Sequence, residues 1–183
     1  MAGCPLPMVI DADGLNALSS DLGVLDKCRG RAVLTPHPGE MARLAGISNS
    51  EVQADRIGVA EAFAQKHGCC LVLKGARTLI AEPEGQIHIN PTGNAALSSG
   101  GSGDVLTGLI AGFLARGWPP GKAAVTGVYL HGLAADRLAE DMGQSGILAG
   151  ELLDVIPGLA SSLARAEWPL KQPPMEREFH QPL

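Results

Sequence analysis

Short apolar runs alternate with amphipathic segments along most of this chain. Residues 8–11 (MVID) and 32–35 (AVLT) are apolar runs that end in a polar residue, and 69–74 (CCLVLK) is a third. Continuous apolar runs of this length are typical of strands buried on both faces of a parallel sheet. Residues 78–81 and 86–89 are predicted to form two further strands, joined by the turn sequence EPEG.

Helical periodicity fills the segments between and after these runs. The segment between Ser50 and Gly68 is predicted to be one helix, because Ser50 and Gln53 are spaced as a capping box and Gly68 is a stop signal. Three more helices are predicted at 105–116, 122–140 and 149–163. Alternation of strands and helices predicts an α/β fold, with a parallel-rich sheet covered by helices on both faces.

Composition narrows the class of ligand. The chain has 183 residues, 45% of them hydrophobic, a net charge of -5 and only 3% aromatics. A nucleic-acid binder needs basic patches and stacking residues, so we expect a small-molecule ligand and no nucleic-acid partner. The four cysteines lack metal-binding spacing, and no segment approaches the roughly 20 apolar residues of a membrane span. We therefore expect a cytoplasmic protein with reduced thiols, no signal peptide and no membrane partner.

Ligands of open α/β sheets bind at the carboxyl ends of the strands, so the loops there are the candidate binding or catalytic sites. Four loops qualify: 11–16 (DADGLN), 35–40 (TPHPGE), 74–78 (KGART) and 90–104, which ends in GGSGD. The last has neither P-loop nor dinucleotide-fold spacing. Its Gly101, Ser102 and Gly103 directly precede a predicted helix, where several amides and the helix dipole favour an anion such as phosphate.

One acid, Asp104, follows these glycines, and two roles remain open for it. It caps the helix, or it accepts a proton from a hydroxyl group while the amides hold a phosphoryl group. The prolines of TPHPGE hold His37 in place after a strand; Pro38 and Glu40 are also explained as an ordinary helix start. KGART alone is explained as an ordinary hairpin, and an Asx turn explains only one of the two acids in DADGLN.

Several of these motifs occur in one known family. TPHPGEMARL, KGART, NPTGNAALSSGGSGDVLTGLIAGFLARG and LHGLAAD resemble the ADP-dependent NAD(P)H-hydrate dehydratases of the ribokinase-like superfamily, and the resemblance runs from Val9 to about Leu163. It implies a three-layer α/β/α sandwich, of which residues 1–165 are the C-terminal portion, followed by an extended, proline-containing tail at 166–183. The family's N-terminal part, with its PGLG-type loop, has no counterpart before Met1, and Ser102 stands where the family commonly has threonine.

The resemblance also implies an activity and roles for particular residues. The reaction is the dehydration of NADHX or NADPHX to NADH or NADPH, with ADP as phosphoryl donor, AMP and phosphate as products, and Mg²⁺. Asp104 resembles the substrate-binding residue and presumed base, and His37 a residue that contacts the hydrated cofactor. Glu40 resembles an acid that positions Mg²⁺ through water, and Asp11, Asp13 and Asn16 are expected in the pocket wall. The nucleotide-binding positions are Lys74, Gly75, Ala76, Arg77, Thr78 and Gly103.

Two alternatives remain at this stage, together with one expectation about assembly. A ribokinase-like kinase of the hydroxymethylpyrimidine or hydroxyethylthiazole type shares the glycine-rich anion hole and its aspartate. An inactive nucleotide-binding fragment is the second alternative. Members of the family are often homotetramers, so the resemblance implies a homo-oligomer.

Overall fold

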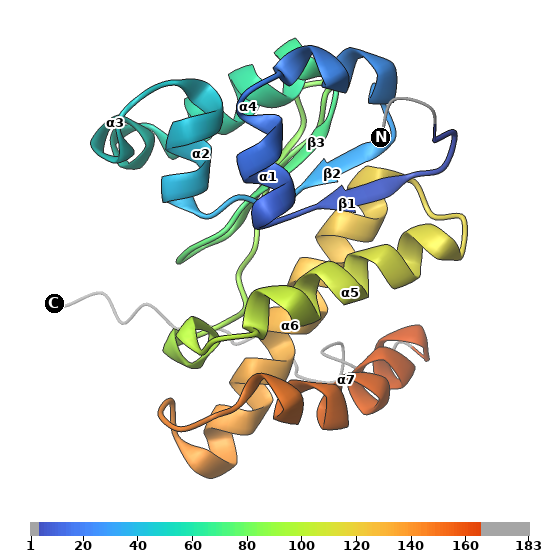
Figure 1. Ribbon diagram of the computed structural model, residues 1–183. Helices are drawn as coiled ribbons and strands as arrows, with labels where there is room; N and C mark the ends of the chain where they lie inside the picture. Colours follow the sequence, from blue (N-terminus) through green and yellow to red (C-terminus); the bar gives the residue numbers. More distant parts are fainter. Residues whose placement is uncertain (1–3, 166–183) are drawn as a thin grey trace, which may run out of the picture.

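The structure, a computed structural model, describes residues 4–165 (Figure 1). Its centre is a five-stranded sheet in the order β1-β2-β3-β4-β5. Strands β1 to β3 are parallel; β4 is antiparallel to β3, and β5 is antiparallel to β4. The five strands predicted from the apolar runs are all confirmed: β1 (Met8–Ile10), β2 (Ala32–Leu34), β3 (Cys70–Leu73), β4 (Leu79–Ala81) and β5 (Ile87–Ile89).

Helices cover both faces of the sheet, as the alternation predicts. One face carries α1 (Asp13–Leu18), α2 (Pro38–Ala45), α3 (Asn49–Ala54) and α4 (Arg56–His67), together with the 3₁₀ segment η1 (Leu22–Cys28). The other face carries α5 (Ser102–Ala115) and α6 (Pro120–Met142), with the 3₁₀ turn η2 (Ala95–Ser98) just before α5. Helix α7 (Ala149–Ala164) packs on α5 and α6, away from the sheet. The arrangement is the α/β/α sandwich that the resemblance implies.

The two cores follow from the two-residue period of the strands. In β3, Cys70 and Val72 pack towards α5 and α6, whereas Leu71 and Leu73 pack towards the α1–α4 layer. All four side chains are buried, which explains why this strand is a continuous apolar run in the sequence.

The prediction of a single helix between Ser50 and Gly68 is wrong. Asp55 has a non-helical backbone (φ -142°, ψ 71°) and separates α3 from α4, and its side chain accepts the Gly58 N–H at 2.8 Å. Short acidic side chains compete for backbone N–H groups in this way, and so favour caps over helix interiors. The capping box lies two residues earlier than predicted, at Ser48 and Glu51, and Gly68 does end α4 in the left-handed conformation.

In the part of the chain that the structure describes, no helix is both long and apolar enough to cross a membrane. The proline-containing tail predicted at 166–183 lies outside the described residues.

Candidate functional site

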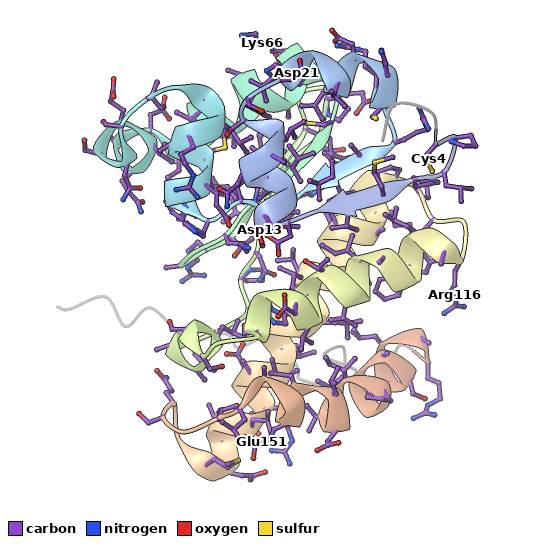
Figure 2. The ribbon with its side chains drawn as sticks, in the orientation of Figure 1. Cys4, Asp13, Asp21, Lys66, Arg116 and Glu151 are labelled. Atoms are coloured by element: carbon purple, nitrogen blue, oxygen red, sulfur yellow. The ribbon has the colours of Figure 1, made fainter. Side chains whose placement is uncertain are left out.

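The candidate site lies where three strands end and one helix begins. Asp11, Thr35 and Lys74 directly follow β1, β2 and β3, and α5 starts at the same edge of the sheet. Figure 2 shows Asp13 at this edge, where α1 begins, whereas Cys4 and Arg116 lie at the opposite ends of β1 and α5. The fold therefore brings together loops that are more than 60 residues apart in the sequence, at the position expected for ligands of such sheets.

Lys74 is the centre of a largely buried charged cluster at this edge. Its Nζ lies 2.8 Å from Oδ1 of Asp11 and 3.8 Å from Oε2 of Glu40. Oδ2 of Asp11 accepts the Thr107 hydroxyl of α5 at 2.9 Å. Burial raises the pKa of Asp11, but the hydrogen bonds from Lys74, Thr107 and Ala12 and the charge of Lys74 outweigh it, so this pKa lies below its ordinary value. Asp11 therefore ties β1, β3 and α5 together.

The first turn of α5 opens next to this cluster. Gly101 is the N-cap residue with φ 86°, a conformation that glycine adopts without strain. The N–H groups of Ser102, Asp104 and Val105 donate to the carbonyls of residues 99 and 101, which leaves the Gly103 N–H without a carbonyl acceptor among the described residues. A methyl group on Gly103 would lie 3.7 Å from Lys74 Nζ and 3.8 Å from Oδ2 of Asp11. The free amide at the helix start and the Lys74 ammonium group favour an anion here, whereas the Asp11 carboxylate opposes one.

A cavity of about 650 Å³ opens over this turn, within the size range of small-molecule sites. Its further walls are the loop and 3₁₀ turn at 90–98 and the middle of α6. Eight of the predicted site residues line it: His37, Lys74, Gly75, Ala76, Arg77, Thr78, Ser102 and Gly103. The structure thus brings all six of the predicted nucleotide-binding residues to the wall of one cavity.

Arg56, which sequence reasoning missed, binds the backbone of the Lys74–Thr78 loop through hydrogen bonds. Its guanidinium donates to the carbonyls of Ala76 at 2.7 Å, Leu73 at 3.2 Å and Lys74 at 3.3 Å. Gly75 and Arg77 both have positive φ (136° and 56°), which is unusual for arginine. Arg56 lies 18 residues before Lys74 and outside any motif, so the sequence held no signal for this contact.

His37 and Glu40 form a capping box at the start of α2. Nδ1 of His37 accepts the Gly39 N–H at 3.0 Å, and Oε2 of Glu40 accepts the His37 N–H at 2.7 Å. The local geometry of TPHPGE is therefore that of an ordinary helix start, and His37 also lines the cavity. Among residues 4–165, no group of three or more potential metal ligands is present.

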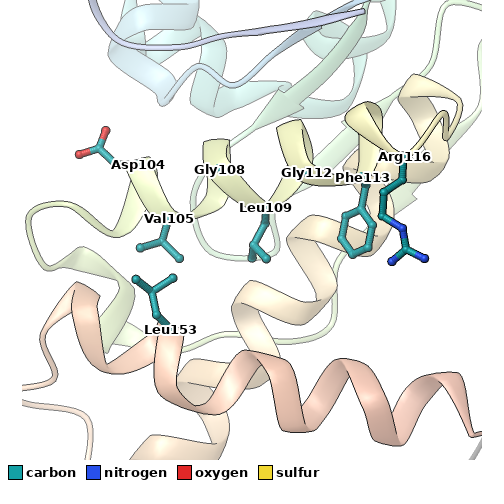
Figure 3. A pocket seen from close by; sticks show the side chains of 8 residues that line it. All are labelled: Asp104, Val105, Gly108, Leu109, Gly112, Phe113, Arg116 and Leu153. Atoms are coloured by element: carbon teal, nitrogen blue, oxygen red, sulfur yellow. The ribbon is translucent and has the colours of Figure 1, made fainter.

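Asp104 does not line this cavity. It is exposed and borders a groove of about 600 Å³ between α5 and α7, although Figure 3 shows its carboxylate pointing away from Leu153 and the other apolar side chains there. It makes no side-chain capping hydrogen bond, since the N-cap is Gly101. Asp104 therefore does not cap α5, and its carboxylate projects from the turn that contains Gly103.

His131 of α6 is a second site residue that the sequence analysis left without a role. It is buried, lines the cavity, and its Nε2 lies 2.9 Å from the Ser102 carbonyl oxygen. Burial lowers its pKa to about 4, so the imidazole is neutral at physiological pH. The signal was present in the sequence, because His131 belongs to the quoted stretch LHGLAAD.

Comparison with known proteins gives a consistent family assignment. The family model described as NAD(P)H-hydrate dehydratase (Carb_kinase) matches residues 2–158. The chain is 52% identical over 158 residues to the bifunctional NAD(P)H-hydrate repair enzyme Nnr of Moorella thermoacetica, covering 86% of this chain and 30% of that protein. It is 44% identical over 163 residues to the ADP-dependent (S)-NAD(P)H-hydrate dehydratase of Neisseria meningitidis serogroup B, covering 87% of this chain and 55% of that protein.

Solved structures agree in fold. The ADP/ATP-dependent NAD(P)H-hydrate dehydratase of Bacillus subtilis, co-crystallised with ATP/Mg²⁺ and soaked with CoA, superposes with a TM-score of 0.72 at 36% identity, covering 85% of this chain and 56% of that one. A hydroxyethylthiazole kinase from Pyrococcus horikoshii reaches 0.66 at 21% identity, covering 82% of this chain and 59% of that one, which shows a shared fold alone. The chain spans about half the length of the dehydratases it matches, and under a third of the bifunctional enzyme.

Proposed function

Because this chain belongs to the NAD(P)H-hydrate dehydratase family, we propose that it acts in nicotinamide nucleotide repair. The reaction is the ADP-dependent dehydration of NADHX or NADPHX to NADH or NADPH, with release of AMP and phosphate. One observation carries the proposal: the Lys74–Thr78 loop and the first turn of α5 line the same cavity at the carboxyl edge of the sheet.

The phosphates of the nucleotide are proposed to bind at the start of α5. The Gly103 N–H, the helix dipole and the Lys74 ammonium group all favour negative charge at this point. The remainder of the nucleotide would extend along the Lys74–Thr78 loop, whose carbonyls Arg56 holds in place. The chemistry of the turn supports a phosphate group as ligand, and the choice of ADP rests on the similarity to the ADP-dependent dehydratases.

The chemistry follows from the poor leaving-group ability of hydroxide. In the proposed reaction the substrate hydroxyl oxygen attacks the terminal phosphorus of ADP, the bond to AMP breaks, and Asp104 accepts the hydroxyl proton. The phosphorylated oxygen then leaves as phosphate, and loss of a ring proton completes the dihydronicotinamide. Asp104 directly follows Gly103 in the first turn of α5, but its carboxylate borders the groove between α5 and α7. The role of base therefore requires a substrate that extends from the cavity to that side of the turn.

Mg²⁺ is proposed to bind mainly through the nucleotide. The described residues hold no cluster of three ligands, and the Glu40 carboxylate already accepts the His37 N–H. Mg²⁺ is commonly held by one or two carboxylates, waters and substrate phosphates, so the charge it neutralises is that of the phosphates. Glu40 contributes through water in this proposal, and His37, at the cavity wall, contacts the hydrated nicotinamide.

Turnover and binding together test the proposal. We expect the chain to regenerate NADH from NADHX, seen as rising absorbance, with ADP converted to AMP and phosphate by chromatography. The Bacillus subtilis dehydratase serves as positive control. ADP binding without turnover would establish the inactive nucleotide-binding alternative instead. Absence of ADP binding would overturn the proposal, and conversion of ATP to ADP faster than ADP to AMP would refute the choice of donor.

A further inference from the structure

Three residues of α6 face the cavity walls and have no part in the proposed reaction. His131, Gly132 and Asp136 all belong to LHGLAAD, the quoted motif that received no role. His131 and Gly132 line the cavity, and Asp136 lies one helical turn further along α6. Each meets a different part of the segments that close the cavity.

His131 meets the anion-binding turn. A carbonyl oxygen only accepts hydrogen bonds, so the Nε2 of His131 carries the proton and donates to the Ser102 carbonyl at 2.9 Å. Ser102 is the first residue of α5 and is buried, and its hydroxyl lies 3.4 Å from the same nitrogen. The imidazole therefore links the middle of α6 to the turn that contains Gly103.

Gly132 and Asp136 meet the opposite wall, the loop at 90–94. A Cβ on Gly132 would lie 2.3 Å from Oγ1 of Thr92 and 2.7 Å from its carbonyl carbon, so only glycine admits the loop this close. The Asp136 carboxylate accepts the Gly93 N–H at 2.8 Å and the Asn94 amide at 2.9 Å. Both oxygens are thus used to fix the loop.

Helix packing alone does not require these contacts. Helices α5 and α6 already meet through apolar side chains, with Ile110 and Val128 in one buried cluster. Gly127 brings the backbones close, since a Cβ there would lie 2.8 Å from the Ile110 side chain. The polar contacts of His131 and Asp136 are made beyond this crossing, where α5 begins and the 90–94 loop passes.

We infer that α6 is the positioning element of the cavity, with His131 as a positioning residue that fixes the anion-binding turn of α5 and Asp136 fixing the opposite loop. The inference rests on the proposed function only for the identity of the ligand, ADP. Burial lowers the pKa of the His131 imidazole to about 4, and its Nε2–H remains a donor throughout the physiological range.

The test compares His131→Leu, which removes the donor, with His131→Gln, whose side-chain amide restores one. Amide hydrogen exchange of the full chain without ligand is the first readout. We expect His131→Leu to speed exchange at Asp104 and Val105, whose N–H groups donate to the Gly101 carbonyl, and not at the far end of α5. His131→Gln should stay close to the parent. His67→Leu, a histidine in α4 remote from the cavity, is the matched control and should leave the turn unchanged.

ADP titration is the second readout. The dissociation constant should rise about five- to tenfold in His131→Leu and by less than about threefold in His131→Gln, the change expected for one buried hydrogen bond. Unchanged exchange and affinity in His131→Leu would overturn the inference. So would an equal effect of both variants spread over the whole chain. If the parent binds no ADP the proposed function fails, whereas the exchange data still decide the role of His131.

Should His131→Leu not fold, Asp136→Ala decides the inference with the same exchange readout. Alanine removes both carboxylate oxygens, so neither the Gly93 N–H nor the Asn94 amide keeps this acceptor. We expect faster exchange at Gly93 and unchanged exchange in α4. Exchange at Gly93 equal to the parent would contradict a positioning role for α6.

Discussion

At the residue scale, the proposed role of Asp104 as a base is the first to test, because its carboxylate neither caps α5 nor enters the cavity. In Asp104→Asn the fold should persist, since the side chain is exposed and nearly the same shape is kept. Turnover should fall by about 10²–10⁴, the usual contribution of general-base catalysis, with ADP affinity unchanged or slightly higher. Thermal melting, ADP titration and NADH absorbance measure the three quantities. Turnover within a few-fold of the parent would remove Asp104 from the mechanism.

Lys74 gives the matching prediction for binding. Lys74→Met keeps most of the side-chain length but removes the ammonium group, which lies 3.7 Å from where a Cβ on Gly103 would be. It also removes the ion-pair partner of the Asp11 carboxylate. ADP affinity should fall by about tenfold or more, through lost attraction and new repulsion from Asp11. Calorimetric titration measures it, with Lys66→Met in α4 as control. Equal ADP affinity in Lys74→Met and the parent would place the phosphates elsewhere.

The sequence predicted the place of a residue at the site only where that residue lies in a motif. His37, Lys74 and Gly103 lie in loops that directly follow strands or precede a helix, so their place at the cavity was predictable. The Asp11–Lys74 ion pair joins residues 63 positions apart, and the Arg56 contacts come from the start of α4, 17 to 20 positions before the carbonyls that Arg56 binds. Pairings of this kind depend on tertiary packing, which periodicity does not encode.

At the element scale, Gly132 tests how closely the 90–94 loop approaches α6. Alanine is favoured over glycine inside helices by about 1 kcal/mol. At Gly132, however, the added Cβ would clash with Thr92, including its backbone, so Gly132→Ala should destabilise the protein by about 1–3 kcal/mol. At Gly158 in α7 nothing lies within 4 Å, and Gly158→Ala should be neutral or stabilising by up to about 1 kcal/mol. Urea denaturation of both variants measures the free energies of unfolding. Equal stabilisation by both would contradict the close approach.

Element existence was predictable and element boundaries were less so. The buried strands are continuous apolar runs, and α5, α6 and α7 begin within three residues of their predicted starts. The break at Asp55 was missed, because the apolar stripe continues across it while the Asp55 side chain bonds Gly58. The short η1 and η2 segments carry no period long enough to detect.

The stability of the whole molecule should depend on pH through His131. Burial lowers its pKa from 6.5 to about 4, so below pH 6.5 the unfolded chain binds a proton that the folded chain does not. Stability is therefore complete above pH 6.5 and falls as the pH drops towards 4, by about 2 kcal/mol between pH 7.5 and 5 from this residue. Denaturation of the parent and His131→Gln at both pH values isolates it, because His67 is common to both. Identical pH dependence in the two proteins would contradict a buried neutral imidazole.

At the scale of the whole molecule, the sequence pattern did not predict the order of the strands in the sheet. The apolar runs do not indicate which strands are neighbours, so the position of β1 at one edge and β5 at the other required the structure. The position of the site was predictable nonetheless, because parallel strands present their carboxyl ends at a common edge.

The central claim is that the nucleotide phosphates bind at the start of α5, against the Lys74–Thr78 loop. An ADP titration followed by the backbone amide signals of ¹⁵N-labelled protein tests it most directly. We predict that the largest shifts occur at Gly103 and Gly75, which line the cavity. Gly108 and Gly112, which line the groove between α5 and α7, should change little. Saturable shifts centred on Gly108 and Gly112, with Gly103 and Gly75 unmoved, would contradict it.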